Sequence, residues 1–144
     1  MKLKDVIQFH TEDTAFNLQE TDKIQNWLAE AAKREGSQIT ALSFIFCSDN
    51  YLYNINVEYL NHDTLTDVIT FQYSELKEDI EGDIFISIDR IKENAEQFKV
   101  SFEHELFRVM IHGTLHLLGY GDKTPEEKTL MTEKENFYLN LLKY

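Results

Sequence analysis

The chain has 144 residues, 42% hydrophobic and 12% aromatic, which is long enough to bury one core and short for two. We therefore expect a single domain over residues 1–144, and no stretch approaches the roughly 20 apolar residues of a membrane span. A formal net charge of −12 disfavours non-specific binding to nucleic-acid phosphates, so any such substrate would need a local positive cleft. The N-terminus lacks the apolar core of a secretory signal, and the lone Cys47 has no intramolecular disulfide partner and fits a reducing compartment. These features predict a cytoplasmic protein that does not bind membranes.

The first third of the sequence predicts a strand, a helix and a second strand. Residues 6–9 have the pattern of a short strand, and Thr21 is the expected cap of a helix that ends near Gly36. The apolar run at residues 39–47 follows. Because both faces of that run are apolar, we expect it at the centre of a sheet, with Cys47 as a buried strand residue.

The middle of the sequence predicts one helix and two further strands. Asp49 is the expected cap of the helix, and a polar loop at residues 61–66 follows it. Residues 67–73 and 83–88 have the β-rich composition of strands, and an acidic connection separates them.

Three helices are expected to complete the chain. Asp89 is the expected cap of the first and Ser101 of the second, while Thr124-Pro125-Glu126-Glu127 has the pattern of a capping box with proline at the first helical position. The resulting order, βαβαββααα, predicts an α/β (α+β) fold. It would have a single sheet of about four strands backed by about five helices, with a metal site on a helix in the C-terminal half.

The most informative pattern is a pair of histidines, His112 and His116, followed six residues later by Asp122. Side chains four residues apart lie on one face of a helix, so both imidazoles can bind a single cation. Gly119 and Gly121 permit the chain to end the helix and turn back, which makes Asp122 the expected third ligand. Three protein ligands leave one coordination position open, which is typical of catalytic rather than structural zinc.

The same histidine spacing also occurs by chance on ordinary helices, so the pair alone is a weak signal. The pattern HxxxHxxGxxD has the local layout of metzincin zinc sites, but Gly113 occupies the position of their catalytic glutamate. A residue without a side chain cannot act as a general base. The usual peptidase interpretation is therefore weakened, while metal binding is not.

Three segments together resemble the YbeY family. They are TDVITF at residues 66–71, GDIFIS at 82–87 and HGTLHLLGYGD at 112–122. The family carries a TDVLSF-like strand, a GDI-x-IS strand and HGxLHLxGYDH in the same order. The resemblance extends from about residue 53 to the C-terminus.

This resemblance implies a cytoplasmic, metal-dependent endoribonuclease that cleaves single-stranded RNA with one zinc ion. It also implies a role in ribosomal RNA processing, particularly maturation of the 3′ end of small-subunit RNA, and in ribosome quality control. The implied partners are ribosomal RNA and the ribosome or ribosomal proteins, and not DNA. The implied fold is a single α/β domain with its metal in a cleft between helices and sheet.

Two positions depart from the family pattern. Asp122 stands where the family usually has a third histidine, and an anionic ligand should acidify metal-bound water less than a neutral one. Leu60 follows Tyr59 where the family commonly has arginine. The guanidinium of arginine can bind a phosphate through two N–H donors, and leucine has no such donors.

Three further residues are candidates to line the site. Asp67 could orient a ligating histidine or cap its loop, and His62 is a candidate base for attack by an RNA 2′-hydroxyl, although loop histidines are commonly solvated. Glu105, seven residues before His112, shares its helix face, with an ordinary solvated glutamate as the alternative. No residue is assigned a catalytic role.

Two other classes of function compete with the ribonuclease. A metalloprotease or other metallohydrolase would use the same ligands on a different substrate, and the glycine at position 113 argues against the protease. A noncatalytic ribosome-assembly factor would keep the fold, with or without the metal, and lose turnover. The departures at Leu60 and Asp122, combined with the acidic charge, keep that alternative open.

Overall fold

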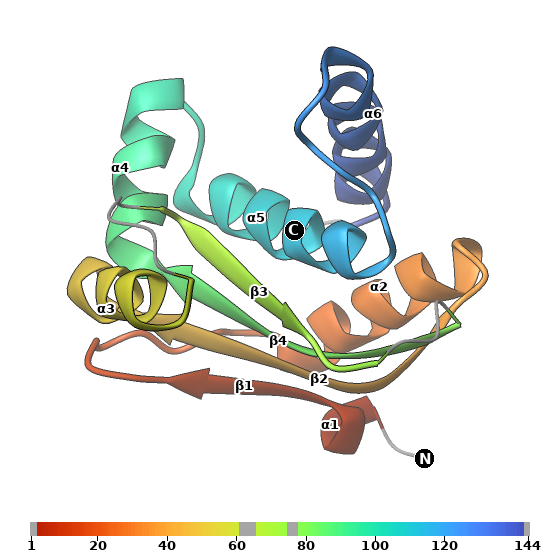
Figure 1. The fold of residues 1–144 in the computed structure, drawn as a ribbon, viewed down its shortest axis with the longest axis horizontal. Coiled ribbons are helices and arrows are strands. Elements are labelled where there is room, and N and C mark those ends of the chain that lie inside the picture. Colours follow the sequence, from red (N-terminus) through yellow and green to blue (C-terminus); the bar gives the residue numbers. More distant parts are fainter. Residues whose placement is uncertain (1–2, 61–65, 75–77, 143–144) are drawn as a thin grey trace.

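Four strands form one mixed sheet, and helices lie on both of its faces (Figure 1). The computed structural model describes residues 3–60, 66–74 and 78–142. The strand order is β1-β2-β4-β3, with β1 and β4 parallel to β2 and β3 antiparallel to β4. The strands are β1 (Ile7–Thr11), β2 (Gln38–Cys47), β3 (Val68–Gln72) and β4 (Asp79–Ser87). The predicted central position of the apolar strand is confirmed, because β2 pairs on both sides.

The described residues contain the five expected helices and one short additional helix at the N-terminus. In chain order the helices are α1 (Leu3–Val6), α2 (Thr21–Arg34), α3 (Asp49–Leu60), α4 (Ile88–Phe98), α5 (Phe102–Leu117) and α6 (Pro125–Leu141). None of them combines the length and the apolar composition that crossing a bilayer requires.

Alternate strand residues build two hydrophobic cores of unequal size. Phe44, Ile84 and Ile86 belong to the larger core, which joins one face of the sheet to residues of α2, α4, α5 and α6. Cys47 and Ile69 belong to the smaller core, which α3 covers on the opposite face. Because neighbouring strand residues point to opposite faces, each of β3 and β4 has one face toward the helices of the larger core and the other toward α3.

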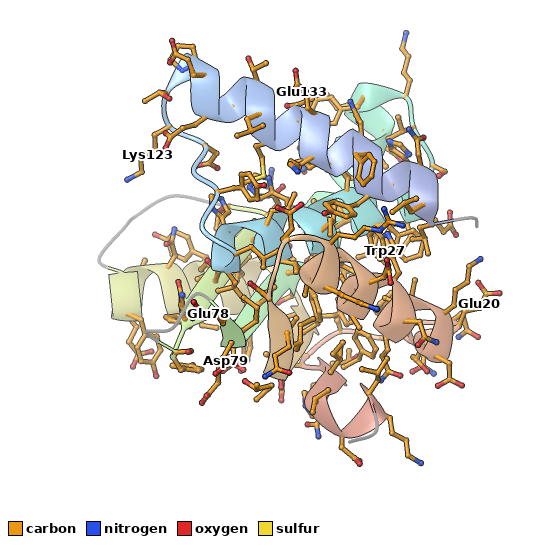
Figure 2. All side chains as sticks on the ribbon, turned by 90° about the vertical axis from the view of Figure 1, so that its right-hand side faces the viewer. Glu20, Trp27, Glu78, Asp79, Lys123 and Glu133 are labelled. Carbon is orange, nitrogen blue, oxygen red and sulfur yellow. The ribbon has the colours of Figure 1, made fainter. Side chains whose placement is uncertain are left out.

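Helix α6 packs mainly against α5 and also contacts Trp27 of α2. The Trp27 indole N–H donates a hydrogen bond of 2.7 Å to the Tyr138 carbonyl oxygen. Figure 2 shows Trp27 on the side of α2 that faces α6. A tryptophan that is 6% exposed needs such a partner for its N–H, and this contact joins segments 111 residues apart.

The boundaries near the N-terminus differ from those predicted. Val6 was expected to begin the first strand, but it ends α1, and β1 begins at Ile7. Thr21 was expected to cap α2, but it is the first helical residue. Glu20 precedes it in the left-handed region with φ 53°, without a side-chain cap.

Two serines take the capping roles that were predicted for aspartates. The Ser48 hydroxyl accepts the amide of the third residue of α3, and the Ser87 hydroxyl accepts the amide of Arg90. The displaced aspartates join the two helices instead. Asp49 accepts the Ser87 hydroxyl at 2.6 Å and pairs with Arg90, and Asp89 accepts the Asp49 amide at 2.9 Å. The predicted caps at Ser101 and Thr124 are confirmed, and the second includes the full capping box.

Strand β4 begins earlier than its composition indicated. Residues 79–82 were predicted to be part of an acidic connection, but Asp79 pairs with Gln38 and Ile80 with Ile39 of β2. The buried Ile80 and the pairing with a central strand therefore outweigh the low strand propensity of the flanking acidic residues.

Candidate metal centre

Helix α5 carries both histidines, and the turn that follows it carries Asp122. Glycine makes this turn possible, because Gly119 adopts φ +108°, a conformation that other residues rarely take. The chain then runs back past the end of α5, and the capping box of α6 begins two residues after Asp122.

The donor atoms of the three residues converge. Nε2 of His112 lies 3.4 Å from Oδ2 of Asp122, and Nε2 of His116 lies 3.2 Å from the same oxygen. All three donor atoms lie within 4.8 Å of one another. Two atoms held about 2.0–2.1 Å from one tetrahedral zinc ion would be about 3.3–3.4 Å apart, and both histidine–aspartate separations are close to that value. Asp122 is 40% exposed, which places the cluster at the protein surface.

The other nitrogen of each ring is held by a hydrogen-bond acceptor. Nδ1 of His112 lies 2.6 Å from Oε2 of Glu135, and Nδ1 of His116 lies 2.9 Å from the Tyr120 carbonyl oxygen. Each acceptor favours the tautomer that has its proton on Nδ1. That tautomer leaves the Nε2 lone pair free for a metal, and such contacts commonly orient metal-ligating histidines.

Glu135 is part of a chain of buried charges. Arg108, one turn before His112 on α5, donates to Oε1 of Glu135 at 3.3 Å and to both oxygens of Glu105 at 2.7 and 2.9 Å. Hydrogen bonds from Arg108 to Glu105 and the nearby carboxylates raise the pKa of Arg108, despite its burial. The guanidinium therefore stays charged and holds the carboxylate of Glu135 beside His112.

Glu105 differs from the ordinary expectation of a solvated helical residue. Its side chain is 1% exposed and pairs with Arg108, which in turn pairs with Glu135. Glu105 is thus joined to His112 through two intervening side chains. Its structural part is to support the guanidinium of Arg108.

Asp67 lies immediately before β3, near this charged chain. Asn94 of α4 donates to Asp67 and to Glu105, each at 3.5 Å. Burial raises the pKa of the Asp67 carboxyl, while Arg108 and His112 oppose that change electrostatically. Asp67 is therefore joined through Asn94 to Glu105, the end of the charged chain that leads to His112.

The turn that carries Asp122 is held against the rest of the protein by Glu35. The Tyr120 hydroxyl donates to Glu35 at 2.5 Å, Lys134 donates at 3.1 Å, and the Tyr138 hydroxyl donates as well. Since the Tyr120 carbonyl orients His116, the carboxylate of Glu35 acts on the histidine through one residue.

Gly113 faces the sheet rather than the donor cluster. A Cβ at this position would lie 3.0 Å from Cγ2 of Ile84 and 3.5 Å from Cγ2 of Thr70. The absence of a side chain therefore has a packing reason: it lets α5 lie close to β3 and β4.

Some candidates contribute nothing to the described geometry. His62 lies outside the described residues, as does the side chain of Leu60. His10 is exposed on β1. Cys47 is buried, and burial together with nearby carboxylates raises the pKa of its thiol to about 12, which fits the predicted unreactive strand residue.

Sequence reasoning missed Glu135 and Arg108. Arg108 lies four residues before His112, as His112 lies four before His116, so all three share one helix face. This repeat could have identified Arg108 from the sequence. Glu135 lies on α6, 23 residues after His112, and nothing in its local sequence distinguishes it from the exposed glutamates of that helix.

The mixed sheet and the His-His-Asp cluster together define an α+β protein with a candidate metal centre. A family model described as "Endoribonuclease YbeY" matches residues 6–143. Relatives named Endoribonuclease YbeY include one from Cytophaga hutchinsonii, 49% identical over 98% of this chain and 99% of its own, and one from Amoebophilus asiaticus, 48% identical over 92% and 90%. The solution structure of TM1509 from Thermotoga maritima is similar with a TM-score of 0.64 and 28% identity, covering 94% of this chain and 87% of that one. The chain belongs to the YbeY endoribonuclease family.

Proposed function

We propose that this protein is a zinc-dependent endoribonuclease, a single domain over residues 1–144 that holds one zinc ion. Its proposed substrate is single-stranded RNA in ribosomal RNA processing, in particular the 3′ end of small-subunit RNA. The proposed setting is the cytoplasm, in association with the ribosome or ribosomal proteins. The observation that carries the proposal is the convergence of Nε2 of His112, Nε2 of His116 and Oδ2 of Asp122 in a chain whose relatives are named endoribonucleases.

In this proposal His112, His116 and Asp122 hold the metal, which when bound would polarise a phosphoryl oxygen and lower the pKa of a bound water. Glu135 and the Tyr120 carbonyl keep the Nδ1 protons in place, so that both rings present Nε2 to the centre. The exposure of Asp122 gives a phosphodiester access from solvent.

Asp122 in place of a neutral ligand has two consequences for the chemistry. A carboxylate lowers the net positive charge of the centre, so bound water is less acidic and the attraction for RNA phosphates is weaker. Among the described residues, the nearby Glu105 and Glu135 share one guanidinium, that of Arg108. We therefore propose slower turnover than a three-histidine centre would give, with Asp67 lining the same site.

Cleavage of a single-stranded transcript that carries a small-subunit ribosomal RNA 3′ end tests the proposal. Wild-type protein would be compared with His112→Ala and His116→Ala proteins purified in the same way. His10→Ala is the matched control, because His10 is exposed on β1. We expect zinc-dependent cleavage by wild type and by the control, and loss of cleavage in both ligand variants.

Equal cleavage by all four proteins would identify a contaminating nuclease and refute the assignment. Metal binding by wild type without any RNA cleavage would favour the noncatalytic assembly factor. Replacement of Asp122 by histidine is a second test, because it should raise the cleavage rate if the anionic ligand limits the acidity of bound water.

A further inference from the structure

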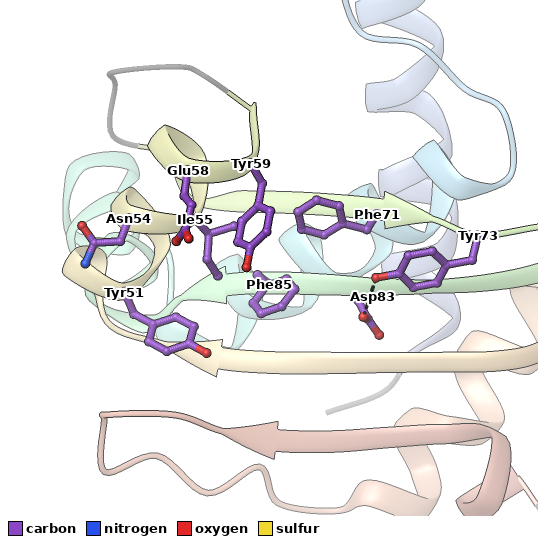
Figure 3. Close-up of a pocket in the computed structure, with 9 residues that line it drawn as sticks. All are labelled: Tyr51, Asn54, Ile55, Glu58, Tyr59, Phe71, Tyr73, Asp83 and Phe85. Carbon is purple, nitrogen blue, oxygen red and sulfur yellow. Dashed lines mark hydrogen bonds between the residues drawn. The ribbon is translucent and has the colours of Figure 1, made fainter.

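A pocket of about 570 Å³ lies between α3 and the strands β3 and β4 (Figure 3). Phe71, Asp83 and Phe85 line it from the sheet. They alternate with Thr70 and Ile84, which lie beneath α5 next to Gly113. The pocket therefore opens on the face of the sheet opposite the His-His-Asp cluster.

Aromatic rings form most of the pocket wall. Tyr59 is 66% exposed and Tyr73 is 58% exposed, although both are large side chains that folding could have buried. Phe71 meets Phe85 edge to face at 5.8 Å between ring centres and meets Tyr59 in the same way at 6.3 Å. Figure 3 shows these rings, together with Tyr51, arranged around one hollow. The faces of aromatic rings carry partial negative charge, so such a wall attracts cations.

Carboxylates complete the pocket. Glu58 and Asp83 line it, and none of its nine described lining residues is lysine or arginine. The Tyr73 hydroxyl donates to Asp83 at 2.8 Å, which holds that carboxylate in the pocket. Burial and Asp83 together raise the pKa of Tyr73, so its hydroxyl remains a neutral donor.

The acidic charge of the chain is concentrated in the segment that builds this pocket. Between Arg34 and Arg90 the sequence has eleven Asp and Glu residues and one basic residue, Lys77, which is a net charge of −10 out of the total of −12. This segment includes α3, β3 and β4. Of these acids, Glu58 and Asp83 line the pocket itself, and their charge favours a cationic ligand there over a phosphate.

We propose that this pocket binds a cationic side chain, arginine in particular, presented by a basic polypeptide. The guanidinium would stack on the exposed ring of Tyr59 and pair with Glu58, while Asp83 adds negative charge at the other end of the hollow (Figure 3). A nucleobase could also stack on these rings, but the phosphates attached to it would approach Glu58 and Asp83, with no lysine or arginine among the described lining residues. Because the pocket and the donor cluster lie on opposite faces of the sheet, this inference does not depend on the proposed nuclease activity.

Fluorescence anisotropy with a labelled, arginine-containing Gly-Ser peptide tests the proposal. The matched probe is the same peptide with citrulline, which keeps the shape of arginine without its charge. The pocket variant combines Glu58→Gln with Tyr59→Ala, both on exposed side chains of α3. The control variant combines Glu96→Gln with Phe98→Ala on α4, where both side chains are exposed, and it makes the same change in charge and aromatic content.

We expect wild type and the control variant to bind the arginine peptide equally. The citrulline peptide and the pocket variant should each weaken binding by about tenfold, as expected for a lost cation–π contact together with a lost ion pair. Equal binding of both peptides, or equal loss in both variants, would show general charge attraction and overturn the proposal. A single-stranded oligonucleotide that loses affinity only in the pocket variant, with the peptide unaffected, would show a nucleobase site and overturn it as well.

Discussion

The substitution Glu135→Gln should weaken zinc binding without removing a ligand. Oε2 of Glu135 lies 2.6 Å from Nδ1 of His112, and Oε1 lies 3.3 Å from Arg108. Glutamine keeps only one acceptor oxygen, so its NH₂ group must face either the Nδ1 proton or the guanidinium, and both are donors. The His112 ring then loses part of the restraint that aims Nε2 at the centre.

The size of this effect depends on the burial of Glu135, whose side chain is 7% exposed. Because water has little access to this position, it does not freely replace the lost contact. Loss of such an orienting partner typically costs about 10- to 100-fold in metal affinity. This corresponds to about 1.4–2.8 kcal/mol at about 1.4 kcal/mol for each tenfold change. We expect Glu135→Gln near the lower value, because one acceptor remains, and Glu135→Ala near the upper.

Competition titration of Zn²⁺ against a chromogenic chelator measures this affinity. Glu133→Gln is the matched control, since Glu133 is exposed on the same helix, as Figure 2 shows. Circular dichroism of the metal-free proteins separates loss of affinity from loss of fold. If folded Glu135→Gln protein bound zinc as tightly as Glu133→Gln, the carboxylate would not orient His112 and the reasoning would be wrong.

Three further predictions concern the rest of the protein. Gly113→Ala should lower the free energy of unfolding by about 1 kcal/mol in chemical denaturation, because crowding against buried Ile84 outweighs the helix preference of alanine; a more stable variant would contradict the close packing. Burial alone would raise the pKa of Glu35, but hydrogen bonds from two tyrosines and a lysine outweigh it and lower the pKa below 4.5. The stability from this carboxylate is thus fully present above pH 4.5 and is lost as pH falls through the lower folded-state pKa, so Glu35→Gln should unfold with less acid dependence in thermal scans across that range. Cys47, with its pKa raised to about 12, should resist alkylation at mildly alkaline pH in native protein and react once the protein is unfolded, as mass spectrometry can test; rapid native labelling would contradict its burial.

Local chemistry in the sequence was sufficient to predict several features of this protein. The i, i+4 spacing of His112 and His116 predicts a shared helix face, because the α-helical repeat alone determines it. The capping box at Thr124 is equally local, since its partners lie three residues apart. The glycines after His116 indicated the turn that brings Asp122 back, and the structure places the three donors together.

Other features depend on partners that are distant in the sequence. Ser48 and Ser87 cap helices where Asp49 and Asp89 were predicted, because both aspartates accept hydrogen bonds between α3 and α4 instead. Strand β4 extends to Asp79 because β2 pairs with it. An aspartate is a good cap in any sequence, and only the packing of two helices decides which acceptor each donor finds.

The orientation of the candidate metal ligands belongs to this second group. Local sequence patterns predict which residues share a helix face and where the chain turns, because both features depend on residues only a few positions apart. Glu135 lies on a separate helix, so its contact with Nδ1 of His112, and the support it receives from Arg108 and Glu105, depend on how the helices pack. That contact exists because α6 packs against α5 and Trp27, so it depends on how whole helices bury their apolar faces rather than on any local pattern.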